Sequence, residues 1–392
     1  MSLRLSTFWF LYMCGWGIFF PYFSLYLGED LGLSGSQVGL VTATIPAMGL
    51  LTQTFWGQLA DRTGSRRVLL ASIAAATAVA AAGLLLARDF ATALAGTALF
   101  AAFSTSVLPM ATSVTLASVG RDRIDRFGWI RMWGTLGFLT MVLVFPRFLE
   151  FAAHSPGARL PLRGLAWMYP ATAVFLLAAS VAAFFLDEAE ALRVRSERGD
   201  FRRLLRHPPM VRLLVVIFAA HLFFQGSITF FPLFIRGRGG HFATVGNMWI
   251  LMLLLEIPLV GLSGPVLRRL GARGLLVMGL TAEGLRWTVS AFSRDLTVIA
   301  AAQLAHGVGV AGLLVGASLY VEQAVPDRLR STAQASYSTV AFGAAAIVSN
   351  AAFGWLFEGF GADVPYAAAG LGNVVLALLV YRVLPDPRLP DS

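Results

Sequence analysis

The chain has 392 residues, of which 57% are hydrophobic and only 13% are charged, and its mean hydropathy is +0.73. A soluble domain carries about 25% charged residues, so this composition excludes a soluble globular protein. The 30 phenylalanines and the high apolar fraction exclude a disordered chain as well. The apolar residues form long unbroken blocks rather than short alternating strands, which indicates a helical membrane protein and not a β-barrel.

The net charge is +9, and every one of the 30 basic residues is an arginine. No nucleic-acid-binding motif accompanies this charge, so we predict no nucleic-acid partner. The single cysteine, Cys14, excludes an internal disulfide. The sequence also lacks a Walker loop and the HExxH, GxSxG and cysteine-metal patterns. We therefore predict no cofactor, no metal and no enzymatic activity.

Apolar blocks long enough to cross a bilayer, which takes roughly 20 residues, occur twelve times along the chain. The blocks lie at residues 6–28, 36–59, 68–87, 90–118, 128–149, 165–186, 211–235, 244–267, 274–292, 296–322, 332–357 and 364–384. They predict an all-α polytopic membrane protein with an N-terminal six-helix bundle (1–186), a charged cytoplasmic linker (187–210) and a C-terminal six-helix bundle (211–392).

The arginines predict the orientation of these helices. With the N-terminus inside, 21 arginines fall in cytoplasmic segments and seven on the opposite side, as the positive-inside rule requires. Both termini are therefore predicted to be cytoplasmic. Arginine richness without lysine is typical of a GC-rich bacterial genome, so we expect a multi-pass protein of the bacterial inner membrane.

A glycine- and arginine-rich motif lies between the second and third blocks. A glycine at 64 permits a tight turn with positive φ, and Asp61 is suited to pair with an arginine as a conformational latch. The alternative is ordinary positive-inside anchoring. The second half of the chain repeats the motif 207 residues later, with Arg268 where Asp61 would be. The motif consists of Gly57, Asp61, Arg62, Gly64 and Arg66.

This motif resembles the cytoplasmic signature of the major facilitator superfamily. The resemblance implies two six-helix bundles related by pseudo-symmetry and solute transport by alternating access. It also implies that the Asp61–arginine pair acts as a cytoplasmic latch.

Six ionisable groups lie well inside the apolar blocks, more than two residues from either end. Each costs about 2.5–3.5 kcal/mol at a helix centre, so each is a functional candidate. These groups are Arg131, His221, Glu256, Glu283, Arg286 and His306.

Arg131 lies in the segment FGWIRMWGTLGF, and Thr135 follows it one helical turn later on the same face. The segment resembles one shared by the branch that contains the lactose permease, the nucleoside–proton symporters and the phenylpropionate permeases. The resemblance implies that Arg131 and Thr135 contact the substrate. The alternative is an arginine that extends to the cytoplasmic edge of the bilayer.

Arg286 precedes His306 by 20 residues, an interval that also resembles the lactose permease, and Glu256 resembles its sugar-binding acid. That permease has an essential acid three residues after its histidine, where this chain has Gly309. Glu283 lies three residues before Arg286 on the same helical face. We therefore hypothesise that Glu256 or Glu283 carries a proton, and that Arg286 and His306 tune it. The alternatives are a static Glu283–Arg286 ion pair and a core histidine.

Aromatic residues form a helical stripe on the first block. Tyr12 and Trp16 could stack on a sugar, a nucleobase or a phenyl ring, although helix packing explains the stripe equally well. Gln225 lies one turn after His221, for which we favour a core role. Arg286, with Arg131, would suit a carboxylate or a hydroxyl-rich ligand.

Together these features predict a monomeric, proton-coupled symporter that takes up a small organic solute, such as a sugar, a nucleoside or an aromatic carboxylate. The expected partners are the solute, protons and the lipid bilayer. Two alternatives stay open, a proton-driven exporter or antiporter of the same fold and a non-transporting membrane sensor.

Overall fold

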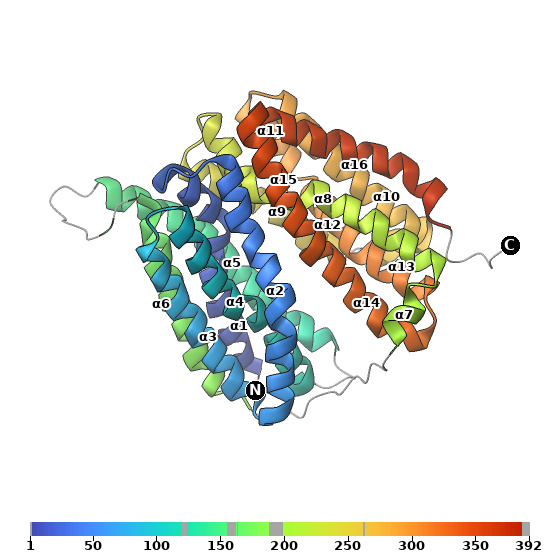
Figure 1. Ribbon diagram of the computed structural model, residues 1–392, viewed down its shortest axis with the longest axis horizontal. Coiled ribbons are helices and arrows are strands. Elements are labelled where there is room, and N and C mark those ends of the chain that lie inside the picture. The colour runs from blue at the N-terminus through green and yellow to red at the C-terminus, as the bar shows by residue number, and fades with distance from the viewer. Residues whose placement is uncertain are drawn as a thin grey trace. The chain divides into compact units, whose positions relative to one another are not determined.

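The structure, a computed structural model, describes residues 2–119, 124–154, 162, 164–187, 199–261 and 263–385. Within these ranges the chain forms helices joined by short connections and contains no β-strand (Figure 1). The helices fall into two compact units. One unit contains α1 to α6 and the stretch His241–Asn247, and the other contains α7, α8 and the helical chain from Met248 onward.

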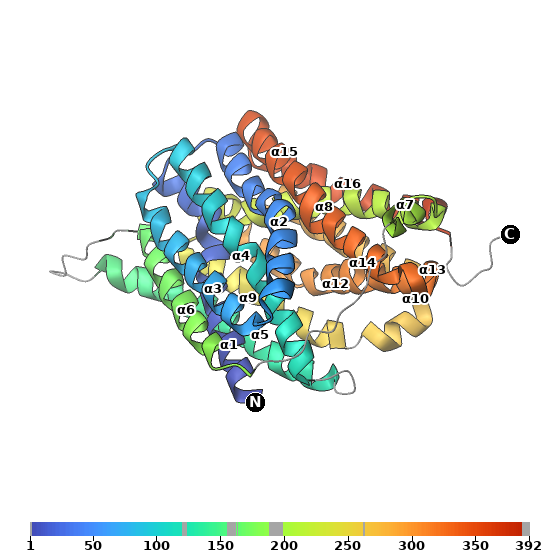
Figure 2. The same cartoon turned by 60° about the horizontal axis from the view of Figure 1, so that its bottom comes forward.

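In the first unit, α1 packs against α5 and α6, α3 packs against α4 and α6, and α2 packs against α4. These helices run side by side in both views of the molecule (Figures 1 and 2). Their bounds are α1 Ser2–Leu25, α2 Gly35–Thr63, α3 Arg66–Gly83, α4 Phe90–Val119, α5 Ile124–His154 and α6 Met168–Phe184.

In the second unit, α10 packs against α16, and α8 packs against α15 and α16. The short helices α11, α12 and α13 follow one another along α10. The bounds are α7 Asp200–Leu204, α8 Pro208–Gly237, α9 Phe242–Gly261, α10 Ser263–Phe292, α11 Leu296–Gln303, α12 His306–Val310, α13 Gly316–Ala324, α14 Arg330–Ser338, α15 Ala345–Phe360 and α16 Asp363–Val383.

Local sequence explains where several helices begin, end or bend. Ser34 caps α2 in a capping box with Gln37. At its other end α2 is followed directly by Gly64, whose φ of 70° favours glycine. Gly271, with φ 70° and ψ 174°, breaks α10 between its first two turns and the apolar run that follows. Three π-helical segments occur in the described residues, directly after α1, α12 and α14: Tyr26–Asp30, Ala311–Val315 and Thr339–Ala344.

Ten helical segments within the described residues are long and apolar enough to cross a membrane. Two of the predicted blocks fall outside that set. They correspond to α9, whose apolar run Phe242–Glu256 is shorter, and to α10, which carries Glu283 and Arg286. The prediction of an all-helical, polytopic fold is confirmed. The two helices that are least like ordinary spans carry Glu256, Glu283 and Arg286.

Candidate functional site

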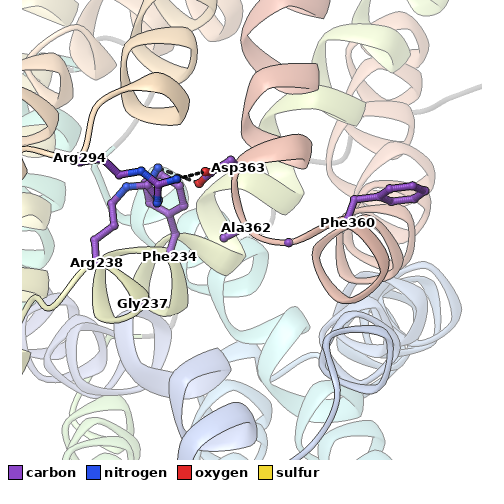
Figure 3. Close-up of a pocket in the computed structure, with 8 residues that line it drawn as sticks. Phe234, Gly237, Arg238, Arg294, Phe360, Ala362 and Asp363 are labelled. Atoms are coloured by element: carbon purple, nitrogen blue, oxygen red, sulfur yellow. Dashed lines mark hydrogen bonds and ion pairs between the residues drawn. The ribbon is translucent and has the colours of Figure 1, made fainter.

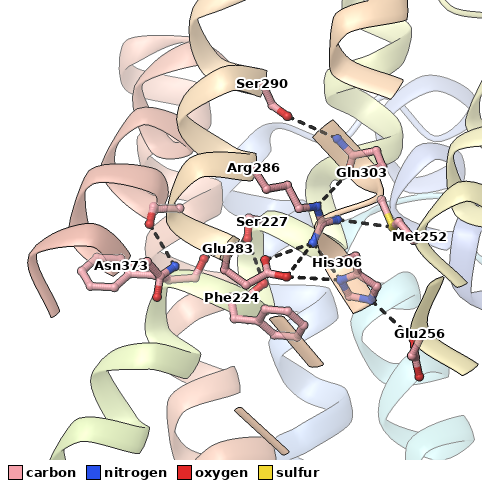
Figure 4. A network of polar contacts seen from close by, with 12 residues as sticks. Phe224, Ser227, Met252, Glu256, Glu283, Arg286, Ser290, Gln303, His306 and Asn373 are labelled. Carbon is pink, nitrogen blue, oxygen red and sulfur yellow. Dashed lines mark hydrogen bonds and ion pairs between the residues drawn. The ribbon is translucent and has the colours of Figure 1, made fainter. Parts of the chain in front are cut away.

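The centre of the candidate site is an ion pair within α10. Arg286 follows Glu283 by three positions, so both side chains leave the same face of the helix. Arg286 Nη1 lies 3.1 Å from Glu283 Oε1 and 3.0 Å from Oε2 (Figure 4). Both side chains are fully buried. The two side chains are therefore in contact, as their helical spacing predicts.

Arg286 also binds residues from three other places in the unit. Its Nε donates to Gln303 Oε1 at 2.8 Å, and Nη2 lies 3.3 Å from Met252 Sδ on α9. Its Nη1 lies 2.8 Å from His306 Nδ1. Gln303 ends α11 and His306 begins α12, so the turn between these two helices brings both side chains to one guanidinium. All three guanidinium nitrogens consequently have acceptors.

The contacts of His306 determine its hydrogen positions. A guanidinium only donates hydrogen bonds, so the contact with Arg286 assigns the acceptor role to Nδ1, and a neutral imidazole in this arrangement carries its hydrogen on Nε2. Nε2 lies 3.8 Å from Glu256 Oε2, and Nδ1 lies 3.4 Å from Glu283 Oε1. His306 therefore lies between two carboxyl groups, and the Phe224 ring lies parallel to its imidazole.

The two carboxyl groups differ in their access to solvent. The Glu256 side chain is 29% exposed, whereas the Glu283 side chain is 0% exposed. A chain of polar groups thus runs from an accessible acid through a histidine to a buried acid that is paired with Arg286. Such a chain is able to accept a proton at one end and redistribute charge at the other.

Close backbone packing holds α12 against its neighbours. A side-chain carbon at Gly307 would lie 2.6 Å from the backbone nitrogen of Glu256, so only glycine permits this approach of α9. Gly312 lies against the backbone of Gly279 on α10 in the same way. These contacts bring the helices that carry the acids to either side of His306.

The predicted substrate residues of the first unit form a separate cluster. The Arg131 guanidinium carbon lies 4.7 Å from the centroid of the Trp9 ring, a cation–π distance. Tyr12 is buried, stacks on Phe8 and meets the edge of Trp16. The aromatic stripe is thus at least partly a packing feature.

Thr135 lies half-buried on α5, four residues after Arg131. Gly134 leaves space for the arginine, since a side-chain carbon there would lie 2.8 Å from Arg131 Nη1. Arg131 and Thr135 therefore share one helix face, as their spacing predicts.

In the predicted latch, Asp61 pairs with Arg66 rather than with the adjacent Arg62. Asp61 Oδ1 lies 2.6 Å from Arg66 Nη2, and Arg66 also donates to the hydroxyl of Ser113 on α4. The Asp61 side chain is 64% exposed. Gly57 lies one turn before Asp61, on the exposed part of α2.

Two further candidate residues, His221 and Gln225, lie on α8. His221 is buried and its Nδ1 lies 3.0 Å from the Ile217 carbonyl oxygen, which agrees with a core role. Gln225 is half-buried, next to Phe224.

Sequence reasoning did not assign Met252, Ser290 or Phe224 to the network. Met252 shares a face of α9 with Glu256 four residues later, and Ser290 shares a face of α10 with Arg286, so helical spacing could have indicated both. Ser290 is 3.3 Å from Gln303 Nε2. Only tertiary packing brings Phe224 to the site.

A second charged cluster lines a pocket at the ends of α8, α10 and α16 (Figure 3). Arg238 binds the backbone oxygens of Ser290 and Ala291 in the last turn of α10 and of Ser293 just beyond it. Its Nη2 lies 2.9 Å from Asp363 Oδ1. Burial lowers the pKa of Arg238, and Asp363 opposes that shift. These contacts fasten helix ends together, so we interpret the cluster as structural.

Comparisons with known proteins agree with this architecture. A family model described as "MFS_1 like family" matches residues 2–368. The maltose permease of Geobacillus stearothermophilus is 26% identical over 379 residues, which cover 96% of this chain and 93% of the permease. The raffinose permease of Escherichia coli is 25% identical over 394 residues, which cover 96% and 90%.

Among solved structures, that of the nucleoside transporter NupG is similar in fold, with a TM-score of 0.85 at 16% identity. The similarity covers 97% of this chain and 98% of that one. The family match extends over nearly the whole chain, and it agrees with the helical fold. The chain therefore belongs to the MFS_1-like family, and it is a membrane transporter of the major facilitator superfamily and not an enzyme.

Proposed function

We propose that the protein is a proton-coupled symporter that takes up a small hydroxyl-rich solute, with a sugar as the first class to test. The observation that carries the proposal is the buried Glu283–Arg286–His306 network, joined to the accessible acid Glu256. The two permeases that align with almost the entire chain, named for maltose and raffinose, support the choice of a sugar.

In this proposal Glu256 and Glu283 carry the coupling proton and His306 connects them. Burying a charge in a membrane is expensive, so an unneeded ion pair inside α10 would burden the fold. If Glu283 gains and loses a proton during the transport cycle, the buried pair has a role in coupling, which would explain why the chain retains it despite this cost. Ionised Glu283 would bind the Arg286 guanidinium strongly, and protonated Glu283 would bind it more weakly.

The solute-contacting residues in this proposal are Arg131, Thr135, Tyr12, Trp16 and Gln225, together with Arg286. Arginine recognises hydroxyl-rich or carboxylate ligands through several donors at once, and aromatic rings stack on sugar faces. The Asp61–Arg66 pair would act as the cytoplasmic latch. We further propose a monomer in the bacterial inner membrane with both termini in the cytoplasm.

The test is solute accumulation in proteoliposomes under an imposed pH gradient. Radiolabelled sugars, nucleosides and aromatic acids are offered outside at acidic external pH, with and without a protonophore. We expect a sugar to accumulate above its external concentration only while the gradient lasts. Accumulation driven by the opposite gradient would instead indicate an exporter or antiporter, and equilibration without accumulation would indicate a facilitator.

A further inference from the structure

The space occupied by the Glu283 carboxyl group is open only because residue 309 is a glycine. Glu283 extends from α10 toward α12, and a side-chain carbon built on Gly309 would collide with its Oε1 atom and with the carbons that carry it. Gly309 follows His306 by three residues on the short helix α12, so it lies next to the imidazole that Glu283 approaches.

This collision differs in kind from those at Gly307 on α12 and at Gly312 on the π-helical segment that follows it. At Gly307 and Gly312 the obstructing atoms belong to the backbones of α9 and α10. Those glycines permit helices to pack. At Gly309 the three nearest atoms all belong to the side chain of Glu283, so a functional group fills the space that this glycine leaves, although the Gly309 carbonyl oxygen also faces Gly279 on α10.

We propose that Gly309 is a positioning residue, whose missing side chain is what lets Glu283 reach Arg286 and His306 at once. The role of this placement in transport rests on the proposed function, whereas the placement of the Glu283 carboxylate by Gly309 does not. A methyl group at 309 would push the carboxylate away from contacts of 3.0 Å to Arg286 Nη1 and 3.4 Å to His306 Nδ1. A displaced carboxylate would leave the charge of Arg286 without its buried partner.

The local sequence His306-Gly307-Val308-Gly309 can then be interpreted as one unit. Gly307 admits the backbone of α9 at Glu256, and Gly309 admits the side chain of Glu283 from α10. Each glycine brings one acid to the histidine between them. The segment thus positions Glu256 on one side of His306 and Glu283 on the other.

The first test is a double-mutant cycle on thermal unfolding of the purified protein. Gly309→Ala is expected to lower Tm by at least about 2 °C in the natural background and to have little effect after Glu283→Ala, which removes the obstructing atoms. The matched control is Gly312→Ala, whose collision is with the Gly279 backbone and should cost the same in both backgrounds. Equal costs of Gly309→Ala with and without Glu283 would overturn the inference.

The second test uses transport and a rescue that a purely structural role would not give. Gly309→Ala is expected to reduce proton-driven uptake about tenfold or more, since displaced groups lose function steeply. The shorter acid in Glu283→Asp should restore part of that uptake in the Gly309→Ala background, although it should lower uptake by itself. Absence of any rescue by Asp, in a double variant that still folds, would overturn the positioning role.

The exchange of Glu283→Gly with Gly309→Glu extends this test, because it returns one carboxylate to the same space from the other helix. We expect more proton-driven uptake than in Glu283→Gly alone. The outcomes separate the two proposals. Suppose that Gly309→Ala lowers Tm only when Glu283 is present, but uptake never depends on protons. This result would support the positioning of Glu283 by Gly309 and reject the proposed function.

Discussion

At the residue scale, the guanidinium of Arg286 organises the buried site. Its three nitrogens bind a carboxylate, a histidine, an amide and a thioether from four elements. Removing one partner from a buried pair costs about 3–5 kcal/mol, because a charge then stays buried without compensation. Replacing both partners costs much less.

Glu283→Gln and Arg286→Gln are therefore each expected to destabilise the protein more than the double variant that carries both. Two neutral amides retain a hydrogen bond without burying a net charge. The Tm values of the two single variants and the double variant, measured in the same detergent, test this ranking of stabilities. Destabilisations that simply add in the double variant would show that the two charges do not compensate each other.

Gln303 provides a second residue-scale prediction. Its side chain accepts from Arg286 Nε and donates to the Ile299 carbonyl oxygen and toward Ser290. Gln303→Leu leaves the buried Arg286 Nε without this acceptor, so we expect a loss of about 1–3 kcal/mol in unfolding free energy. The exposed Gln58→Leu on α2 is the matched control. Equal, small losses for both variants would contradict the buried role of Gln303.

At the element scale, the end of α10 depends on an arginine from another helix. The Arg238 side chain is only 4% exposed and binds three backbone oxygens there, whereas Arg294, which shares Asp363 with it, is 76% exposed. Hydrogen bonds from a charged group are worth about 1.5–3 kcal/mol, and an exposed ion pair is worth about 1 kcal/mol or less.

Arg238→Leu should therefore lower the unfolding free energy clearly more than Arg294→Leu, although both variants lose a contact with Asp363. Thermal or denaturant unfolding of the two variants side by side provides the measurement. A similar stability of the two variants would mean that Arg238 does not fasten the end of α10.

The connection between α2 and α3 provides a different kind of prediction. Because Asp61 is largely exposed, Asp61→Asn is expected to change stability by less than about 1 kcal/mol. If the Asp61–Arg66 pair acts as a latch, uptake should nevertheless fall several-fold. Initial rates and Tm, measured on the same preparation, separate the two effects. Unchanged uptake would reject the latch and leave positive-inside anchoring as its explanation.

The sequence predicted some elements better than others, for physical reasons. Hydropathy was sufficient for most spans because the bilayer requires long apolar helices. The Glu283–Arg286 contact followed from helical spacing, since it lies within one helix. The joint approach of Gln303 and His306 to Arg286 was not predictable, because it depends on the turn between α11 and α12 and on packing against α10.

At the scale of the whole molecule, the family and its fold are established, and the central claim is that solute movement and proton movement are coupled. The most direct measurement is proton flux triggered by solute alone. Proteoliposomes that enclose a pH-sensitive dye, with no imposed gradient, receive the sugar that accumulates in the uptake assay.

We predict that the lumen acidifies as the sugar enters, and that Glu283→Gln abolishes this signal. Glu358→Gln, an exposed acid on α15, should retain it. Sugar entry at a normal rate without any change in luminal pH would contradict proton coupling. A signal that survives both Glu256→Gln and Glu283→Gln would contradict the assignment of the proton to these acids.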